Sequence, residues 1–457
     1  MKKNISQVVA IIGGGVAGSE VAAQLAERGI GCLLFDQHAL PYGKIEEGLP
    51  KWHVKLRDQE EQKIDQKIDQ PDVHYVPSTG LGRDITLKEL QAWGVSAIVL
   101  AVGAWRDRRL PIKDIDDYVG RGLYYQNQLV SWFNHKHESP PRINPCEIQD
   151  GSIVIGGGLA SLDVVKIVMF EIVLEALRKK GIKADLFNLE KEGIPYILKQ
   201  QGLTVKKLGI KGCTLFYRRR IEDMPLTPLP PSINKTRKQK IFELRKRILA
   251  NYQLKYCFTV KECYFPVDKI TENDRLAGLV FQMAESQPKK TSAAPSKLIE
   301  IRAPLVVSSI GSVPEKVAEI PLQDGLIELE DPQTGKVKGY DNIFAVGNAV
   351  TGRGNIRESL IHSREISRVL MRDILEWQTD HFEELVRLQE LNSAQTVKEL
   401  DRQLKSRAAL SAADISEILD RVRQLQRRVG YEGNYQEWIR KNLPVRLENM
   451  EHERSTD

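Results

Sequence analysis

Three glycines near the start of the chain have the spacing of a dinucleotide-binding turn. Gly13, Gly15 and Gly18 form a GxGxxG motif between the apolar run 8–12 and an alanine-rich helical pattern. In such a turn the first glycine permits a tight bend, and the second lets a pyrophosphate approach the backbone. The third allows the helix to pack closely on the strand. This order of residue types predicts a site for a dinucleotide.

The neighbouring segments complete this first site. Val16 and Ala17 open the helical pattern, and the free amides and positive dipole end of a helix N-terminus attract phosphate. A second apolar run, 32–35, ends in Asp36, whose carboxylate could accept hydrogen bonds from a ribose diol. A glycine turn with a strand, a helix and an acid in this order favours nucleotide binding over a purely structural turn.

A second strand-to-helix turn of the same kind follows residue 150. Its apolar run leads into a GxGxxS motif and the start of another helix, with members Gly156, Gly158, Leu159, Ala160 and Ser161. A serine in the third place still permits close packing, although it is less permissive than glycine. Two such units in one chain are much more specific for nucleotide binding than one unit alone.

The strand that follows the second turn decides which nucleotide this turn would bind, and two segments qualify. The first lies nearer the usual spacing and ends in Glu190, an acid that would favour NAD(H). The second, 213–217, is more strand-like and leads into Arg218 and Arg219, which could pair with the 2′-phosphate of NADP(H). We favour the second segment; the alternative for its arginines is a solvated strand end.

The composition indicates a globular protein of ordinary polarity. The 457 residues carry a net charge of +6 at pH 7, and 41% of them are hydrophobic and 28% charged. These fractions are typical of a soluble chain with two or three domains. The mild basic excess alone would allow nucleic acid binding, but no motif of interleaved aromatic and basic residues supports it. It fits an acidic protein partner equally well.

The five cysteines are scattered and form no CxxC motif. We therefore expect neither a redox-active disulfide nor a cysteine-bound iron–sulfur cluster, and we assign no metal site. Reduced thiols, and a first strand that begins too early to leave room for a signal peptide, predict a cytoplasmic protein. The most apolar helical stretch, 164–177, contains charged residues and is too short to cross a bilayer.

Two later apolar runs end at glycine, where a cofactor could lie close to the backbone. The first contains Gly103, and the second contains Gly347 followed by Asn348. We expect the second run to return the chain to the first domain, before a helix over 357–376. Beyond it the sequence is densely charged and helical, and we assign that tail no chemistry of its own.

Together these residues resemble the two-dinucleotide flavoprotein family over roughly residues 5–375. The similarity is strongest to the branch with adrenodoxin reductase, bacterial ferredoxin–NADP reductases and the small subunit of glutamate synthase. The resemblance implies that the first glycine motif and Asp36 hold FAD and the second holds NADPH. It matches the loop 42–53 to the family's loop beside the flavin, with Gly43 and Gly48 within it. The cofactor-binding residues that it adds are Gly103, Gly347, Asn348, Gly354, Asn355 and Ile356.

The same resemblance implies roles for two further groups of residues. His53 stands at the family's histidine position, where it would orient the site or handle its proton, with Asp163 as its hydrogen-bonding partner. Arg218 and Arg219 match the family's 2′-phosphate pair. By themselves, His53 would be a surface loop histidine and Asp163 an acid favoured by the dipole at a helix start.

The chain also departs from the family pattern in three places. Asn348 stands where many relatives carry a flavin-binding Asp, or a Trp in adrenodoxin reductase. The cysteine-rich N-terminal domain of the glutamate synthase small subunit is missing, so electrons would pass from the flavin directly to an outside acceptor. Residues 181–210 form an insertion after the second motif.

The predicted fold class is α/β, with two Rossmann-like nucleotide-binding domains of the glutathione-reductase type. The NADP domain, 141–318, is inserted between the FAD-domain parts 1–140 and 319–377, and a helical extension covers 378–457. The expected activity is that of an FAD-dependent NADPH oxidoreductase that passes electrons to an iron–sulfur protein such as ferredoxin. The alternatives are a flavoprotein subunit of a larger glutamate-synthase-like complex, docked through the tail, and a non-catalytic redox sensor.

A basic segment is the candidate docking surface for such an acceptor. Residues 235–247 hold seven Lys and Arg residues, directly after the 2′-phosphate arginines. Iron–sulfur acceptors of the ferredoxin type are strongly acidic, so this segment would steer them to the NADP domain. The alternative is that it is only a solvated helix face.

Overall fold

Two separate, mainly parallel sheets organise the chain. The computed structural model describes residues 5–138, 144–227, 229, 234–283, 297–351 and 374–449. The larger sheet has the strand order β17-β18-β19-β4-β1-β2-β3. In that order its strands are Leu329–Asp331, Lys336–Val337, Ile343–Ala345, Ala97–Leu100, Val8–Ile12, Gly31–Phe35 and Val73–Val76. Strands β19 to β3 pair parallel, and β17, β18 and β19 pair antiparallel. This sheet therefore joins distant parts of the chain.

The central strands of the first sheet are buried on both faces. All residues of β1 and β2 are buried, as expected for short runs of Val, Ile and Leu in a parallel sheet. Val9 and Ile11 pack on one face with α1, α3, α12 and α14, whereas Val8 and Ala10 pack on the other with α4 and α13. These helices are Val16–Glu27 (α1), Val54–Ile68 (α3), Leu87–Ala92 (α4), Ile374–Ser406 (α12), Ala412–Arg428 (α13) and Tyr435–Asn442 (α14).

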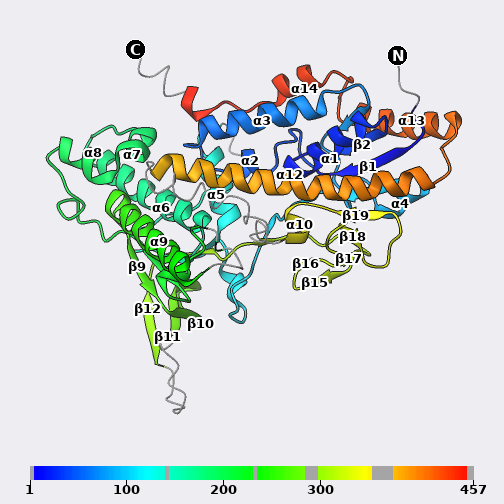
Figure 1. Ribbon diagram of the computed structural model, residues 1–457. Coiled ribbons are helices and arrows are strands. Elements are labelled where there is room, and N and C mark those ends of the chain that lie inside the picture. Colours follow the sequence, from blue (N-terminus) through cyan, green and yellow to red (C-terminus); the bar gives the residue numbers. More distant parts are fainter. Residues whose placement is uncertain are drawn as a thin grey trace, which may run out of the picture.

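The second sheet has five parallel strands in the order β6-β13-β7-β8-β9. In that order they are Leu123–Tyr125, Val306–Ser309, Ile153–Gly156, Thr214–Tyr217 and Thr259–Glu262. Helices α5 (Gln126–His135), α6 (Leu159–Arg178) and α9 (Lys235–Tyr256) pack with it in one core. An antiparallel sheet of β10 (Tyr264–Glu272), β11 (Arg275–Met283) and β12 (Leu298–Arg302) extends from this unit (Figure 1).

Two short antiparallel strands carry the chain between the sheets. They are β5 (Arg106–Asp107) and β14 (Ser312–Val313). The chain changes sheets at β5, because β6 already pairs with β13 of the second sheet. Residues 123–125 therefore lie in the second sheet, whereas the sequence predicted them in the first part of the FAD domain, 1–140. The small elements α2 (Lys44–Glu47), α10 (Asn348–Thr351), β15 (Leu322–Gln323) and β16 (Leu326–Ile327) belong to the first part.

The structure decides between the two candidate strands after the second turn. Residues 214–217 form β8, which pairs with β7, as favoured from the sequence. The alternative was wrong, since the segment ending at Glu190 is helical. It forms α7 (Leu186–Glu192), and α8 (Ile194–Gln200) follows. Helix α9 continues to Tyr256, and β9 begins at Thr259.

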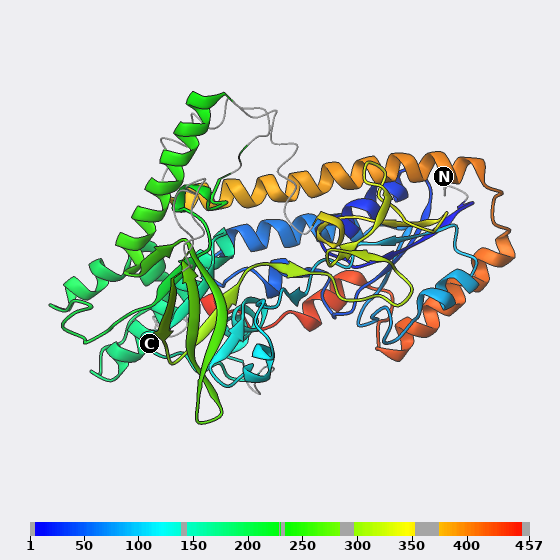
Figure 2. The same ribbon diagram turned by 90° about the horizontal axis from the view of Figure 1, so that it is seen from below.

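The C-terminal helices pack back onto the first sheet. Helix α12 runs beside α1 along one face of this sheet, and α13 and α14 follow it around the same part of the molecule (Figures 1 and 2). Trp438 Nε1 donates to the Ala39 carbonyl at 2.7 Å, and Gln426 Nε2 donates to the Tyr75 carbonyl at 2.7 Å. The apolar side of this tail is thus used within its own chain. Among the described residues, no helix has the length and apolar character that crossing a membrane requires.

Candidate active site between two glycine turns

The three glycines of the first turn are held in different environments, which explains their spacing. Gly13 has φ +106°, and a Cβ there would lie 2.4 Å from the Ala101 carbonyl oxygen. A Cβ on Gly18 would lie 1.8 Å from the carbonyl oxygen of Gly13. A Cβ on Gly15 would meet no atom within 4 Å. The first and third glycines are therefore required by the fold, whereas the second leaves space for a ligand above the backbone.

The second turn repeats this arrangement. A Cβ on Gly156 would lie 2.1 Å from Ser161 Oγ, and a Cβ on Gly158 would meet no atom within 4 Å. Ser161 Oγ donates to the Ser309 carbonyl at 3.0 Å, so the serine ties α6 to β13. Leu159 and Ala160 open α6, as Val16 and Ala17 open α1. Neither helix has a side-chain cap, and both can offer free N-terminal amides to phosphate.

Asp36 lies at the end of β2, beside the first turn. Its carboxylate accepts hydrogen bonds from Gly14 N at 2.7 Å and His38 N at 2.8 Å. Burial raises the pKa of Asp36, and these two backbone donors act in the opposite direction. The carboxylate is therefore fixed against the glycine turn, where its remaining lone pairs can accept bonds from a ligand hydroxyl.

Three other predicted glycines have positive φ values and lie near this turn. A Cβ on Gly43 would be 3.9 Å from Gly15 Cα, and one on Gly347 would be 2.9 Å from Ala17 Cβ. Gly103 follows β4, next to Trp105. Two further predicted positions face elsewhere: Gly48 packs against Lys44 at the end of α2, and the amide oxygen of Asn348 accepts a bond from Gln389 on α12. Gly354, Asn355 and Ile356 lie outside the described residues.

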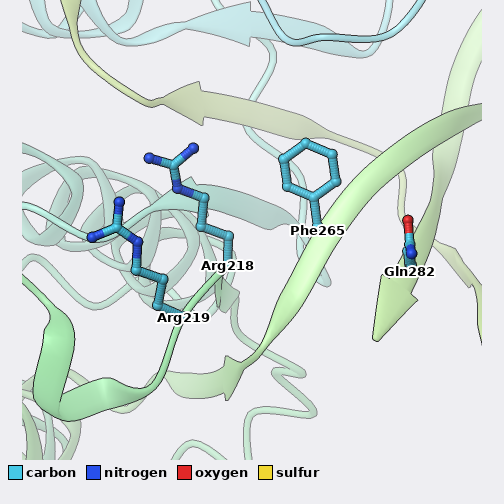
Figure 3. A pocket seen from close by; sticks show the side chains of 4 residues that line it. All are labelled: Arg218, Arg219, Phe265 and Gln282. Atoms are coloured by element: carbon cyan, nitrogen blue, oxygen red, sulfur yellow. The ribbon is translucent and has the colours of Figure 1, made fainter. Parts of the chain in front are cut away.

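Arg218 and Arg219 line an open cavity at the end of β8. The cavity has a volume of about 420 Å³, and Phe265 of β10 and Gln282 of β11 complete its lining (Figure 3). Among the described residues, Arg220 is paired with Glu222 and Asp223, whereas no carboxylate forms an ion pair with the two cavity arginines. Two unneutralised guanidinium groups facing one opening suit an anion such as a phosphate.

His53 and Asp163 meet at the junction of the two units. His53 lies at the start of α3 and Asp163 in the second turn of α6. Their side chains are 9% and 14% exposed, and His53 Nε2 is 3.8 Å from Asp163 Oδ1. This separation is longer than a direct hydrogen bond. Asp163 Oδ1 is buried and has no hydrogen-bond partner among the described residues, so this oxygen is available to the imidazole or to a ligand.

Several residues of this region were not singled out from the sequence. Phe265 and Gln282 come from the antiparallel sheet. No sequence motif predicts that this sheet lies beside β8. Lys166 lies beneath Asp163 and pairs with Glu190 at 2.8 Å. A lysine in the apolar pattern of α6, three residues after Asp163, was a usable signal, because fully buried lysines are rare unless paired.

The whole fold has a counterpart among solved structures. It is similar to FprA of Mycobacterium tuberculosis, solved in complex with NADPH, with a TM-score of 0.63 at 17% sequence identity over 92% of this chain and 91% of the other. This likeness confirms the predicted fold class, in which two Rossmann-like domains are combined in one chain.

Curated proteins of similar sequence come from the predicted branch. A probable mitochondrial NADPH:adrenodoxin oxidoreductase of Schizosaccharomyces pombe is 29% identical over 36% of this chain and 34% of its own length. The mitochondrial NADPH:adrenodoxin oxidoreductase of Arabidopsis thaliana is 26% identical over 53% of this chain and 52% of its own. The small chain of glutamate synthase [NADPH] of Bacillus subtilis is 30% identical over 36% and 33%.

These matches confirm the predicted resemblance, and they are partial. The aligned part covers between a third and about half of the length of these three relatives. No model of a known protein family matches the chain.

Proposed function

We propose that the protein is an FAD-dependent NADPH oxidoreductase. The main observation behind this proposal is that segments next to the two glycine turns meet at one contact. His53 follows the loop beside the first turn, Asp163 lies on the helix that the second turn opens, and the two side chains face each other at 3.8 Å. Ligands bound at the two turns would therefore meet at this contact.

The residues of the first turn fit FAD. The open space above Gly15 and the uncapped start of α1 suit its pyrophosphate, and Asp36 suits its ribose. When bound, FAD would accept a hydride from NADPH and release electrons to an acceptor. The polypeptide binds and orients both nucleotides, and the His53–Asp163 pair can hold or move a proton at the imidazole nitrogen.

The second turn fits NADPH rather than NADH. The space above Gly158 suits the nicotinamide nucleotide's pyrophosphate. Arg218 and Arg219 line the cavity at the next strand end, where a 2′-phosphate would lie. The acid proposed as the NAD(H) alternative, Glu190, is buried in a helix and paired with Lys166, which supports this choice.

The acceptor in this proposal is an acidic iron–sulfur protein, as the adrenodoxin oxidoreductase relatives suggest by their names. The exposed cations of α9 form its docking surface, and the basic surface is defined as Lys235, Lys238, Lys240, Lys246 and Arg247. Arg245 does not belong to it, although it lies in the predicted basic segment. It is 5% exposed and donates to Thr227 and to the Glu222 carbonyl.

A second candidate is a flavoprotein subunit of a larger NADPH-dependent complex, which the glutamate synthase relatives favour. The tail would not serve as a free docking arm in such a complex, because α12, α13 and α14 are packed on the first sheet. A reducing compartment such as the cytoplasm suits both candidates, since all five cysteines are unpaired thiols.

The visible spectrum of the purified protein tests this function. The proposal requires flavin absorption that bleaches rapidly on anaerobic addition of NADPH, and slowly or not at all with NADH. A colourless protein that takes up no added FAD would refute it. A yellow protein that NADPH leaves oxidised would instead indicate a nucleotide-binding sensor. A second, cluster-bearing chain that co-purifies would favour the subunit candidate.

A further inference from the structure

A buried lysine lies directly behind the His53–Asp163 contact. Lys166 follows Asp163 by three residues on α6, and its side chain is 0% exposed. Its Nζ is 2.8 Å from Glu190 Oε1 and 4.0 Å from Asp163 Oδ1. The ammonium group also lies 4.3 Å from the ring centroid of Trp52, the residue before His53. The ammonium group of Lys166 therefore lies close both to Asp163 and to the residue next to His53.

The contacts of Lys166 join α6 to distant segments of the chain. Trp52 comes from the loop of the first unit, yet it packs in the core of the second against Phe133 and Phe170. Glu190 comes from α7, within the insertion after the second glycine turn. A change at Lys166 would thus alter the loop that carries His53 and the helix that carries Asp163 together.

Lys166 is the cation that lies between two carboxylates of this cluster. It pairs with Glu190 and lies 4.0 Å from the unpartnered oxygen of Asp163. Two hydroxyls of α9, those of Tyr252 and Tyr256, interact with the same carboxylates, and burial raises the pKa of each. A buried carboxylate without a compensating charge is unfavourable, so removing Lys166 would disturb the arrangement of both acids.

We propose that Lys166 is a positioning residue for His53 and Asp163, and that the inserted helix α7 takes part in the site by supplying Glu190 as its counter-charge. This inference rests on the proposed function. The side chain of Lys166 is fully buried and acts through its neighbours. Anchored by Glu190, it attracts the unpartnered oxygen of Asp163 and supports the ring of Trp52, which fixes the carboxylate and the imidazole relative to each other.

Four variants separate this role from ordinary core packing. Lys166→Met alone leaves Glu190 buried and unpaired, which can unfold the protein. The double variant Lys166→Met/Glu190→Leu removes both charges and keeps the volume, a replacement that proteins often tolerate. Lys166→Arg keeps the charge. Lys179→Met makes the same substitution just past the end of α6, where the side chain is 72% exposed.

Two measurements on the FAD-loaded protein are decisive. The first is the rate of anaerobic flavin reduction by NADPH, with NADP⁺ affinity measured beside it. The second is the NMR signal of the His53 ring against pH in the resting protein. His53 is one of eight histidines, and its signal is assigned by its loss in His53→Gln.

We expect the double variant to fold and bind NADP⁺ normally, to be reduced roughly 10- to 100-fold more slowly, and to show displaced His53 ring signals. Where Lys166→Met folds, its His53 ring signals should be displaced as well. Lys166→Arg should restore the rate, and Lys179→Met should match the unmodified protein.

If the double variant keeps its rate of flavin reduction and its His53 ring signals, the Lys166–Glu190 pair is only a structural ion pair and the proposal is wrong. If NADPH does not reduce the unmodified protein, the proposed function fails, and the His53 signals in the resting protein still decide whether Lys166 positions the imidazole.

Discussion

Gly15 and Gly158 occupy equivalent places in the two strand-turn-helix units, and at both a Cβ would point into open space. Their φ values are −62° and −92°, which any residue can adopt. Substitution at either position should therefore spare the fold and block only the nucleotide above it.

Valine substitutions at Gly15 and at Gly158 test the two nucleotide sites separately. Gly15→Val should give folded, colourless protein, because the side chain fills the space of the FAD pyrophosphate. Gly158→Val should keep the flavin and lose its reduction by NADPH. Flavin absorbance and circular dichroism measure both effects, and Gly18→Val, which clashes with the Gly13 carbonyl, is the control for misfolding. A folded Gly15→Val protein with full flavin content would remove the FAD assignment.

Replacing Arg218 and Arg219 by alanine should raise the KM for NADPH and leave that for NADH nearly unchanged. Each hydrogen bond from a guanidinium to the 2′-phosphate should contribute about 1.5–3 kcal/mol. Arg220→Ala is the matched control, because that arginine is already paired with Glu222 and Asp223. Equal use of NADPH and NADH by the unmodified protein would contradict this assignment.

Charge reversal on the basic surface should slow electron transfer to a ferredoxin. Lys240 and Arg247 are exposed and lie on the same side of α9, so Lys240→Glu/Arg247→Glu should weaken the steering of an acidic acceptor. Rising salt should weaken it too, since screening lengths are about 8 Å at physiological ionic strength. Reduction of a small neutral dye should stay intact. If ferredoxin reduction depends neither on the charge reversals nor on salt, the basic side of α9 is only a solvated helix face.

A buried ion-pair cluster holds the C-terminal segment against the loop of the first unit. Arg446 pairs with Glu46 and, at 3.0 Å, with Glu61. Arg446→Met should lower the free energy of unfolding by up to about 3–5 kcal/mol, because it removes the guanidinium that two buried carboxylates share and, among the described residues, leaves them only Lys51 at 3.2 Å and Arg57 at 3.9 Å. Chemical denaturation measures this loss, and Arg440→Met on the exposed side of α14 is the control. Equal stability of the two variants would show that the cluster contributes nothing.

The same cluster should make stability depend on pH. Burial raises the pKa of Glu61 to about 7, against the lowering effect of Arg446. The protonated form therefore stabilises the fold; this contribution is complete below the ordinary value of 4.5 and is lost as the pH rises through about 7. The midpoint of thermal unfolding should accordingly fall between pH 5 and 8. Glu61→Gln should flatten that dependence, and an unchanged slope in this variant would exclude Glu61 as its source.

The sequence alone was enough to predict the parts of the fold and site where only one residue type fits. The glycine motifs predicted both turns, since only glycine fits at Gly13 and Gly18. The strand-like composition of 214–217 also identified β8 correctly. These signals are local, and the fold class they support was confirmed by the likeness to FprA.

The remaining features depend on partners far away in the sequence. The helical period places Arg245 on the apolar side of α9, but the group that satisfies its buried guanidinium, Thr227, lies outside the helix. Likewise β6 joined the second sheet only because β13 pairs with it. The packing of the charged tail also depends on a distant partner, because Trp438 donates to a carbonyl near the other end of the chain.

The first sheet closes with β19, which is synthesised after the whole of the second sheet, and its helical cover comes later still. On the ribosome, the strands β1, β2 and β4 therefore emerge long before their last partners, while the second sheet is complete as soon as β13 appears. Domains fold as units during synthesis. The unit built on the second sheet should accordingly mature first, and the first glycine turn should be able to hold a nucleotide only after β19 and the helices α12, α13 and α14 have been synthesised.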